Sequence, residues 1–358
     1  MPIIDVHCHL FNFKKVEDYY PSDFFKGFTE SEEEVSFLSL IGKPSQRIAE
    51  QLLHYYPEGS IIVPLMMDFG YGGKLIGGTI DTFNEQLINL RLLKERFKKT
   101  DRNCIFPFLA VDPRRPNILN LVKQLVKPTQ AFHGVKIYPP LGYLPSHPKL
   151  MEVFKHCQEK DIPITTHCIP NGSIHCKTSD VDINGIDPVS GDLIDSIINF
   201  ASGNDLSNYF ANPTNWLPVL QRFPKLRLNF GHFGGFYCSE KEDHDFIEGS
   251  PNQNTHNIEL TWRETIVGFM QEYENVYADI SFIMASLPDH RKAAPYLLSL
   301  VKDSKIGDRI LYGSDFYMVY STSKKGFAIA LNGIRSMLGD QFDKIAWENP
   351  KRFLKLEL

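Results

Sequence analysis

The sequence lacks the features of several protein classes. It has no apolar run long enough to cross a bilayer and no N-terminal leader for secretion, so we expect neither a membrane partner nor export. Its six cysteines include no CxxC pair, which excludes a zinc ribbon or a small disulfide framework and indicates a reducing cytoplasm. The net charge of -5 provides no basic excess to neutralise phosphates, so nucleic acid is not an expected partner.

Short runs of apolar and β-branched residues recur along the chain instead. They cover residues 3–9, 60–69, 104–113, 132–138, 162–167, 226–232, 275–281 and 309–315. Amphipathic patterns between them predict helices over 81–99, 146–161, 214–223, 260–273, 289–302 and 323–338. Strands that are buried on both faces and alternate with helices indicate a parallel sheet, and eight such units predict a distorted (β/α)8 barrel. A doubly wound open sheet is the alternative, but no Gly-rich phosphate loop follows the first run.

The domain organisation follows from the spacing of these runs. No shift in composition or linker marks a second domain, so we expect one barrel over residues 1–358. Three connections are long, at 10–59, 168–213 and 233–259. Because loops that follow barrel strands lie at the C-terminal face, we expect these three to build the substrate pocket.

Polar side chains stand where the predicted strands end. In "DVHCH", His7 and His9 are two residues apart and point to the same side of a strand. His167 ends the fifth predicted strand, His232 the sixth and Asp315 the eighth. An isolated HxH pattern is equally compatible with two hydrogen-bonded core histidines, but five polar residues at strand ends favour one site at the mouth of a barrel. Imidazoles and a carboxylate are suitable ligands for zinc.

Seven motifs together resemble a known family. They are "IDVHCHLF", "GVKIYPP", "PITTHC", "FPKLRLNFGHFGG", "ENVYADIS", "LYGSDF" and "WENPKRFLKL", and they run in the family's order from residue 4 to residue 356. The chain resembles the amidohydrolase superfamily, in particular the amidohydrolase-related (amidohydrolase 2) branch that includes aminocarboxymuconate-semialdehyde decarboxylase.

The resemblance implies roles for the strand-end residues. His7, His9 and His167 bind a divalent metal, which we expect to be Zn2+, and Asp315 completes the ligand set or accepts a proton from the bound water. His232 then acts as general acid or base, which suits a side chain whose pKa lies near neutrality.

Lys136 ends the fourth predicted strand and has three possible roles. In binuclear members of the superfamily a lysine at this place is carboxylated and bridges two metals, whereas the branch resembled here is generally mononuclear. We therefore expect the amine to bind a substrate carboxylate or carbonyl oxygen, and a solvent-facing structural lysine is the third interpretation. Tyr138 lies on the same face and could line the pocket. Gly234 and Gly235 allow either close approach to a ligand or a tight turn.

The sequence thus predicts a metal-dependent hydrolase. A metal-activated water attacks an electrophilic carbon, in an amide, ester, lactone or related C–N or C–O bond, of a small and possibly carboxylated substrate. The alternative is a metal-dependent nonoxidative decarboxylase of an aromatic or dienoic acid. A non-catalytic metal-binding barrel is disfavoured because it would not need His232 and Asp315 beside its ligands. The expected partner is a small-molecule substrate, and a homodimer is common in the family. The sequence leaves substrate, metal number and oligomeric state open.

Overall fold

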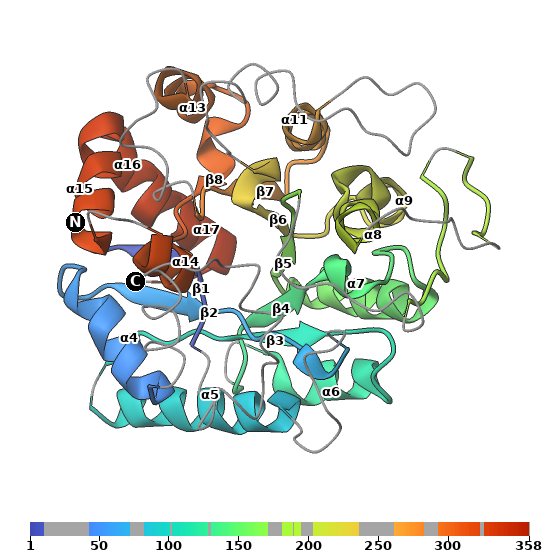
Figure 1. Cartoon of the computed structure of the whole chain (residues 1–358), viewed down its shortest axis with the longest axis horizontal. Coiled ribbons are helices and arrows are strands. Elements are labelled where there is room, and N and C mark those ends of the chain that lie inside the picture. The colour runs from blue at the N-terminus through green and yellow to red at the C-terminus, as the bar shows by residue number, and fades with distance from the viewer. Residues whose placement is uncertain are drawn as a thin grey trace. The chain divides into compact units, whose positions relative to one another are not determined.

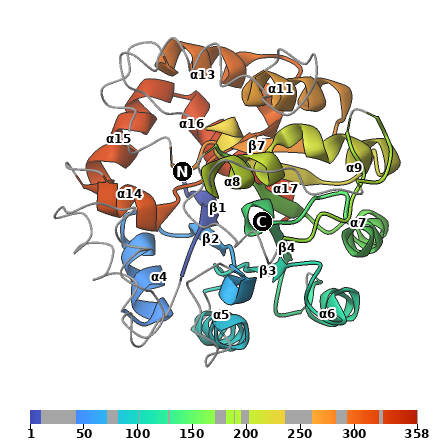
Figure 2. The ribbon, with the colours of Figure 1, turned by 45° about the vertical axis from the view of Figure 1, so that its right-hand side comes forward.

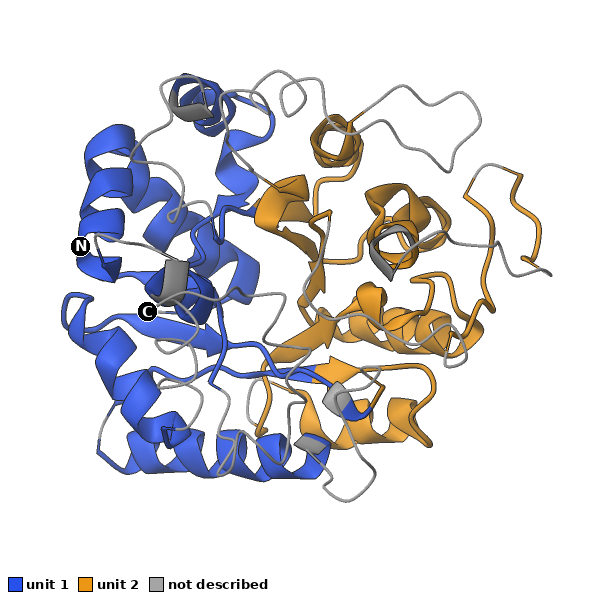
Figure 3. Ribbon diagram, in the orientation of Figure 1, with its two compact units in different colours: residues 1–70, 74–109, 279–358 blue, residues 71–73, 110–278 orange. Residues whose placement is uncertain are grey.

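The chain forms two compact units (Figure 3). The structure, a computed structural model, describes residues 1–10, 43–71, 82–100, 102–127, 130–170, 181–188, 190–194, 203–235, 261–282, 293–322 and 326–357. Unit 1 comprises Met1–Gly70, Lys74–Leu109 and Asp279–Leu358, and unit 2 comprises Tyr71–Gly73 and Ala110–Ala278. Among the helices of the described residues, none is long and apolar enough to cross a membrane.

The described residues form eight strands. They are β1 (Ile4–Cys8), β2 (Ile61–Pro64), β3 (Phe108–Val111), β4 (Gly134–Ile137), β5 (Ile164–His167), β6 (Leu228–Gly231), β7 (Val276–Asp279) and β8 (Ile310–Leu311). Each strand lies inside one of the eight predicted runs, and every residue of every strand is buried. Burial on both faces is the property from which the parallel sheet was predicted.

The strands pair in parallel and in sequence order. In unit 1, β1 pairs with β2 with Ile4 opposite Ile61, and the Val6 N–H donates to the carbonyl of Tyr312, directly after β8. In unit 2, β4 to β7 pair in succession. Parallel strands that follow one another in this way, each connected through helical segments, have the organisation of a (β/α)8 barrel. The predicted fold class is confirmed.

Helices connect and cover the strands (Figures 1 and 2). In unit 1 they are α4 (Ser45–His54), α5 (Thr82–Lys99), α13 (Ala293–Lys302), α14 (Phe316–Thr322), α15 (Phe327–Leu338), α16 (Gln341–Asp343) and α17 (Asn349–Leu354). In unit 2 they are α6 (Ile118–Leu125), α7 (Pro148–Lys160), α8 (Gly203–Ala211), α9 (Leu217–Arg222) and α11 (Trp262–Glu272). All six predicted helices are present, and the one expected over 214–223 begins with a 3-10 turn at Pro213–Trp216.

Helix α11 shows how local sequence sets an element's start. The Thr261 hydroxyl accepts a hydrogen bond from the backbone N–H of Glu264 at 3.1 Å, and the Glu264 carboxylate accepts from the N–H of Thr261 at 2.8 Å. This reciprocal cap satisfies two N–H groups that have no partner within a helix. The helix then buries Ile266 and Phe269 on one face.

An aromatic cluster in the core of unit 2 connects α7 to β6 through Trp216 of the 3-10 turn. The rings of Phe154 and Trp216 have centroids 5.3 Å apart, and Trp216 lies 6.0 Å from Phe230 of β6. All three side chains are almost completely buried. Truncating such a side chain to alanine typically costs about 3–5 kcal/mol, so these contacts stabilise β6, which His232 directly follows.

Much of the three predicted loops lies outside the described residues, including 11–42, 171–180 and 236–259. The described parts contain two helices that the sequence analysis placed in loops, α4 within 10–59 and α8 within 168–213. Helix α4 buries Ile48, Ala49 and Leu52 on one stripe, a spacing typical of an amphipathic helix. The single domain with three pocket-building loops stays a prediction.

Candidate metal centre

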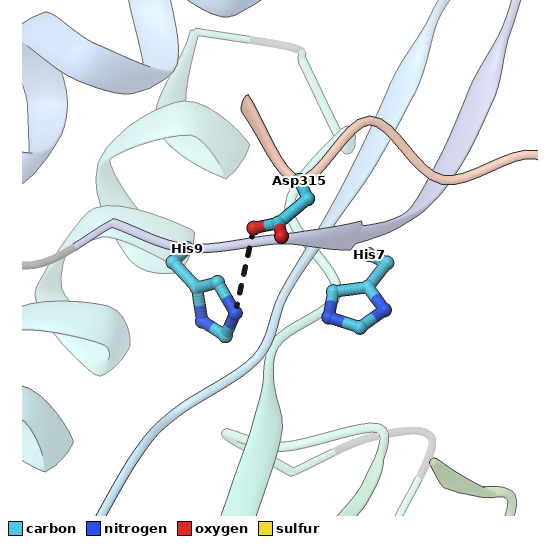
Figure 4. Close-up of side chains that lie close together, drawn as sticks. All are labelled: His7, His9 and Asp315. Atoms are coloured by element: carbon cyan, nitrogen blue, oxygen red, sulfur yellow. Dashed lines mark ion pairs between the residues drawn. The ribbon is translucent and has the colours of Figure 1, made fainter. Parts of the chain in front are cut away.

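Three polar side chains meet at strand ends of unit 1 (Figure 4). His7 is the penultimate residue of strand β1, His9 follows the strand, and Asp315 follows β8. Each offers one ligand atom, and these atoms all lie within 4.8 Å of one another. His9 Nε2 is 3.9 Å from Asp315 Oδ1, and the rings of His7 and His9 stand nearly perpendicular, at 78°. The two histidines do share a side of the chain, as their spacing predicted.

The hydrogen bonds of the two imidazoles fix which nitrogen each presents. His9 Nδ1 is 2.8 Å from the carbonyl oxygen of Leu65, which can only accept, so Nδ1 carries the proton. His7 Nδ1 is 3.0 Å from Asp279 Oδ2, and a carboxylate fixes the same tautomer. Both rings are therefore oriented with the lone pair on Nε2, the arrangement found in histidines that bind metals.

Asp279 is a residue that the sequence analysis quoted but did not assign. It ends β7, is fully buried, and accepts a hydrogen bond from the hydroxyl of Ser281. Ser281 Oγ also lies 3.0 Å from His7 Nδ1. The signal was a carboxylate at the end of a predicted strand in "YADIS", but its partner is 272 residues away in sequence. Sequence spacing alone gave no reason to pair the two.

Asp315 is held in an uncommon backbone conformation. Its φ is +47°, in the left-handed region that costs a non-glycine residue about 1–3 kcal/mol. Its N–H donates to the carbonyl of His7 at 2.8 Å, which ties the residue to β1. Two residues earlier, a Cβ on Gly313 would stand 2.6 Å from Cβ of His7, so only glycine permits this approach. The surrounding contacts, rather than local preference, place the carboxylate beside the histidines.

Asp5 lies two residues before His7 on β1 and is fully buried. Burial raises the pKa of Asp5 to about 6, and hydrogen bonds from Ser314, Tyr56 and the backbone of His7 act in the opposite direction. Burying the Asp5 carboxylate is therefore energetically unfavourable, and its hydrogen bonds offset part of this desolvation free energy.

A second histidine pair occupies strand ends of unit 2. His167 ends β5, and His232 directly follows β6. His232 Nε2 is 3.2 Å from His167 Nδ1, and the ring of Tyr138 lies 4.4 Å from that of His167 between centroids. In this hydrogen bond one nitrogen must donate and the other must accept, so the protonation states of the two rings are linked. Such a pair can hold and transfer a proton.

The backbone after β6 makes an unusually sharp turn. Four consecutive residues from His232 to Gly235 have positive φ, at 63°, 47°, 74° and 91°. Gly234 N–H donates to the carbonyl of Cys168, and a Cβ on Gly234 would lie 3.1 Å from the backbone nitrogen of Arg263. The tight-turn interpretation of the two glycines is thus confirmed. His232 is presented by this turn.

The burial of Lys136 excludes one of the three roles considered for it. Its side chain is only 1% exposed, so a solvent-facing structural lysine is wrong. The alternation of residues in "GVKIY" did not reveal this, because both faces of β4 are buried. Tyr138, two residues on, is also buried, and its backbone N–H donates to the hydroxyl of Tyr143 at 2.8 Å. The roles in substrate binding or metal bridging stay predictions.

A cavity of about 720 Å³ in unit 1 is not lined by His7, His9 or Asp315. It opens at the start of β2, and its lining includes Ser60, Arg102, Cys104 and Trp347. Burial raises the pKa of the Cys104 thiol to about 11, so this cysteine stays protonated and weakly nucleophilic at neutral pH. The cavity lacks His7 and the other candidate ligands and has no part in the metal centre.

The predicted site residues are thus divided between the units. Unit 1 brings together His7, His9 and Asp315, and unit 2 brings together His167 and His232. The convergence of all five at one mouth stays a prediction.

Comparisons with solved structures identify similar folds. A dihydroxybenzoic acid decarboxylase from Polaromonas sp. JS666, with bound manganese and the inhibitor 2-nitroresorcinol, is 16% identical, with a TM-score of 0.58 over 100% of this chain and 98% of that one. A 2,6-dihydroxybenzoate decarboxylase from Rhizobium is 16% identical, with a TM-score of 0.57 and complete coverage of both chains. A probable 2-pyrone-4,6-dicarboxylic acid hydrolase from Acinetobacter baumannii with bound citric acid is 13% identical, with a TM-score of 0.55 over 99% and 100%.

At these identities the solved structures establish the fold alone. No curated protein matches the chain. The model of one family, described as Amidohydrolase, matches residues 4–356, almost the whole sequence and the same span as the seven motifs. The chain therefore belongs to the amidohydrolase family of enzymes.

Proposed function

We propose that the protein is a divalent-metal-dependent hydrolase of a small, carboxylated molecule. The observation that carries the proposal is the grouping of His7, His9 and Asp315, with ligand atoms within 4.8 Å and each Nδ1 held by an acceptor. Histidine tautomers are fixed in this way where imidazoles serve as metal ligands. His167 is proposed as the third imidazole ligand, on the family resemblance.

The donor set fits a divalent transition metal. Imidazole nitrogen and carboxylate oxygen suit Zn2+, and the same set with open positions also suits Mn2+. We propose zinc, and we note that the Polaromonas decarboxylase contains manganese. Both ions are therefore needed in any reconstitution experiment.

The catalytic roles follow from what each side chain can hold. When bound, the metal would lower the pKa of a coordinated water and polarise a carbonyl group. Asp315 would take the proton of the attacking water, since its carboxylate lies near His9, one of the proposed ligands. His232 would give a proton to the leaving group, and its hydrogen bond with His167 would orient its ring. The buried amine of Lys136 would bind a substrate carboxylate.

Decarboxylation is the second candidate reaction. It is favoured by the names of two of the similar structures, both decarboxylases of dihydroxybenzoates. In that reaction the bond between ring carbon and carboxylate breaks, carbon dioxide leaves, and the ring carbon takes a proton from a general acid. Asp315 or His232 would supply that proton instead of serving water attack. The hydrolase from Acinetobacter shows the same fold with the first reaction in its name.

A panel of carboxylated substrates separates the two reactions. The metal-depleted protein is reconstituted with zinc or manganese and incubated with aromatic acids, dienoic acids, lactones and amides. Release of carbon dioxide without new acid groups would establish decarboxylation, and release of acid without carbon dioxide would establish hydrolysis. No turnover with either ion, in a protein that holds metal, would favour the non-catalytic barrel.

Metal stoichiometry tests the role of Lys136. We expect close to one metal per chain, because the described residues contain one compact group of three possible ligands. Two metals per chain would move Lys136 into a carboxylated bridging role. The homodimer stays a prediction, which sedimentation analysis would check.

A further inference from the structure

Asp5 is the centre of a buried hydrogen-bond network next to the candidate ligands. Its Oδ1 accepts hydrogen bonds from the backbone N–H groups of Ser314 at 2.9 Å and His7 at 3.2 Å. Its Oδ2 accepts from the hydroxyls of Ser314 at 2.6 Å and Tyr56 at 2.9 Å. One carboxylate therefore joins strand β1, the turn after β8 and the segment after α4.

These bonds act on the backbone that carries the ligands. Ser314 directly precedes Asp315, whose N–H in turn donates to the carbonyl of His7 at 2.8 Å. Asp315 keeps a left-handed φ of +47°, which surrounding contacts must impose. With both its N–H and its hydroxyl bonded to Asp5, Ser314 cannot rotate without breaking two hydrogen bonds. The two hydrogen bonds of Ser314 thereby restrict the position of the next residue, Asp315.

Stability alone is a poor explanation for a carboxylate at this position. Burying an ionisable group is costly, and a well-packed apolar residue in its place is often neutral or stabilising. The hydrogen bonds to Asp5 come from neutral donors, namely two backbone N–H groups and two hydroxyls. What the carboxylate adds is four directed hydrogen bonds that define a single geometry.

We propose that Asp5 is a positioning residue for the metal centre, which holds Asp315 against His7 and His9 by tying Ser314 to strand β1. The proposal rests on the proposed function, because it concerns the same ligands. Asp5 acts through the backbone of its neighbours and takes no part in ligation or proton transfer.

Two substitutions of Asp5 separate geometry from charge. Asp5→Ala removes all four hydrogen bonds, and we expect the dissociation constant for the metal to rise roughly 10- to 100-fold, the usual effect of losing a partner that orients ligands. Asp5→Asn keeps the shape. Its amide oxygen can accept from the two N–H groups, and its NH2 group can donate to the hydroxyls of Ser314 and Tyr56, which also accept. We expect this variant to bind metal within a few-fold of the parent.

The measurement is metal affinity of the folded full-length chain, by competition with a chelator, together with the thermal midpoint. Asn349→Ala is the matched control. Asn349 is fully buried in the same unit, and its amide donates to the carbonyls of Gly307 at 2.9 Å and Ile310 at 2.7 Å. We expect the control to lower the midpoint without changing metal affinity. If Asp5→Ala does not fold, Ser314→Ala removes the 2.6 Å hydroxyl bond alone and should weaken metal binding less.

Three results would overturn the proposal. The first is parent-like metal affinity in Asp5→Ala, or in Ser314→Ala where the former does not fold, with only the midpoint lowered. The second is an Asp5→Asn variant that loses metal as strongly as Asp5→Ala, because charge rather than position would then be required. The third is a parent chain whose metal binding does not depend on His7 and His9, which would overturn the proposed function and this inference with it.

Discussion

Two histidine pairs stand at strand ends of this chain, and their hydrogen bonds differ. In unit 1, His7 and His9 each bond through Nδ1 to an outside acceptor, the carboxylate of Asp279 and the carbonyl of Leu65. In unit 2, His167 and His232 bond to each other. The tautomers of the first pair are fixed by acceptors outside the pair, whereas in the second pair one ring must donate to the other.

The difference in hydrogen bonding suits the two pairs to different proposed roles. A metal ligand needs a fixed tautomer that leaves the lone pair of Nε2 available for the metal. A hydrogen bond between two rings instead suits a residue that transfers a proton. We therefore propose that both members of the first pair bind metal, whereas in the second pair His167 binds metal and His232 transfers a proton. Substitutions in each pair should affect different measurements.

The largest effect is expected from removing a ligand of the first pair. His7→Ala or His9→Ala takes away an imidazole donor, so metal content and all metal-dependent turnover should be lost. Elemental analysis of the purified variants checks this. His54→Ala, an exposed position on α4, is the control and should leave metal content unchanged. Full occupancy with unaltered affinity in both variants would refute the assignment of the first pair.

Asp315→Asn comes next. An amide oxygen can still ligate but cannot take a proton, so most of the metal should remain while turnover falls roughly 10²- to 10⁴-fold. Steady-state kinetics and metal analysis on the same sample measure both quantities. If Asp315 is mainly a ligand, the two losses will track each other and added zinc will restore both. Parent-level turnover with full metal would refute either role.

His232→Gln sharpens the contrast between the pairs. It removes the imidazole of His232 but not the proposed ligand His167, so turnover should fall about 10²-fold while metal content stays near that of the parent. A pH profile of kcat should lose one ionisation. Loss of metal in this variant would show that the second pair also has a ligating function through His232.

Asp279→Ala tests whether the partner of His7 fixes its tautomer. Metal affinity should weaken roughly 10- to 100-fold without abolishing binding, because the imidazole remains but loses its orientation. Chelator competition gives the dissociation constant. Unchanged affinity would mean that the bond between His7 and Asp279 is only structural.

The smallest effect is expected at a cap of unit 2. Thr261→Ala removes the hydroxyl that caps α11 and should lower the free energy of unfolding by about 1 kcal/mol. Urea denaturation measures this. Metal content should not change, and a marked loss would connect the stability of α11 to the metal centre.

Several features of the fold could be predicted from the sequence because they depend on neighbouring residues. All eight strands lie within apolar runs, and the two-residue spacing placed His7 and His9 on one side. The run 104–113 gives a strand only at Phe108–Val111, since hydrogen bonding to neighbouring strands, rather than apolar character, sets where a strand ends. Helix α4 has an amphipathic pattern, but the sequence analysis assigned it to the long connection over residues 10–59.

By itself, the sequence determined the order of strands and helices and the residue types at the strand ends, since both follow from local periodicity. Only the tertiary structure decided the partners of those residues. Asp279 reaches His7 across 272 positions, and Asp5 reaches Ser314 across 309. The burial of Lys136 and the left-handed backbone of Asp315 are likewise imposed by packed neighbours. Contacts between residues so distant in sequence form only when the strands assemble, and no local pattern encodes them.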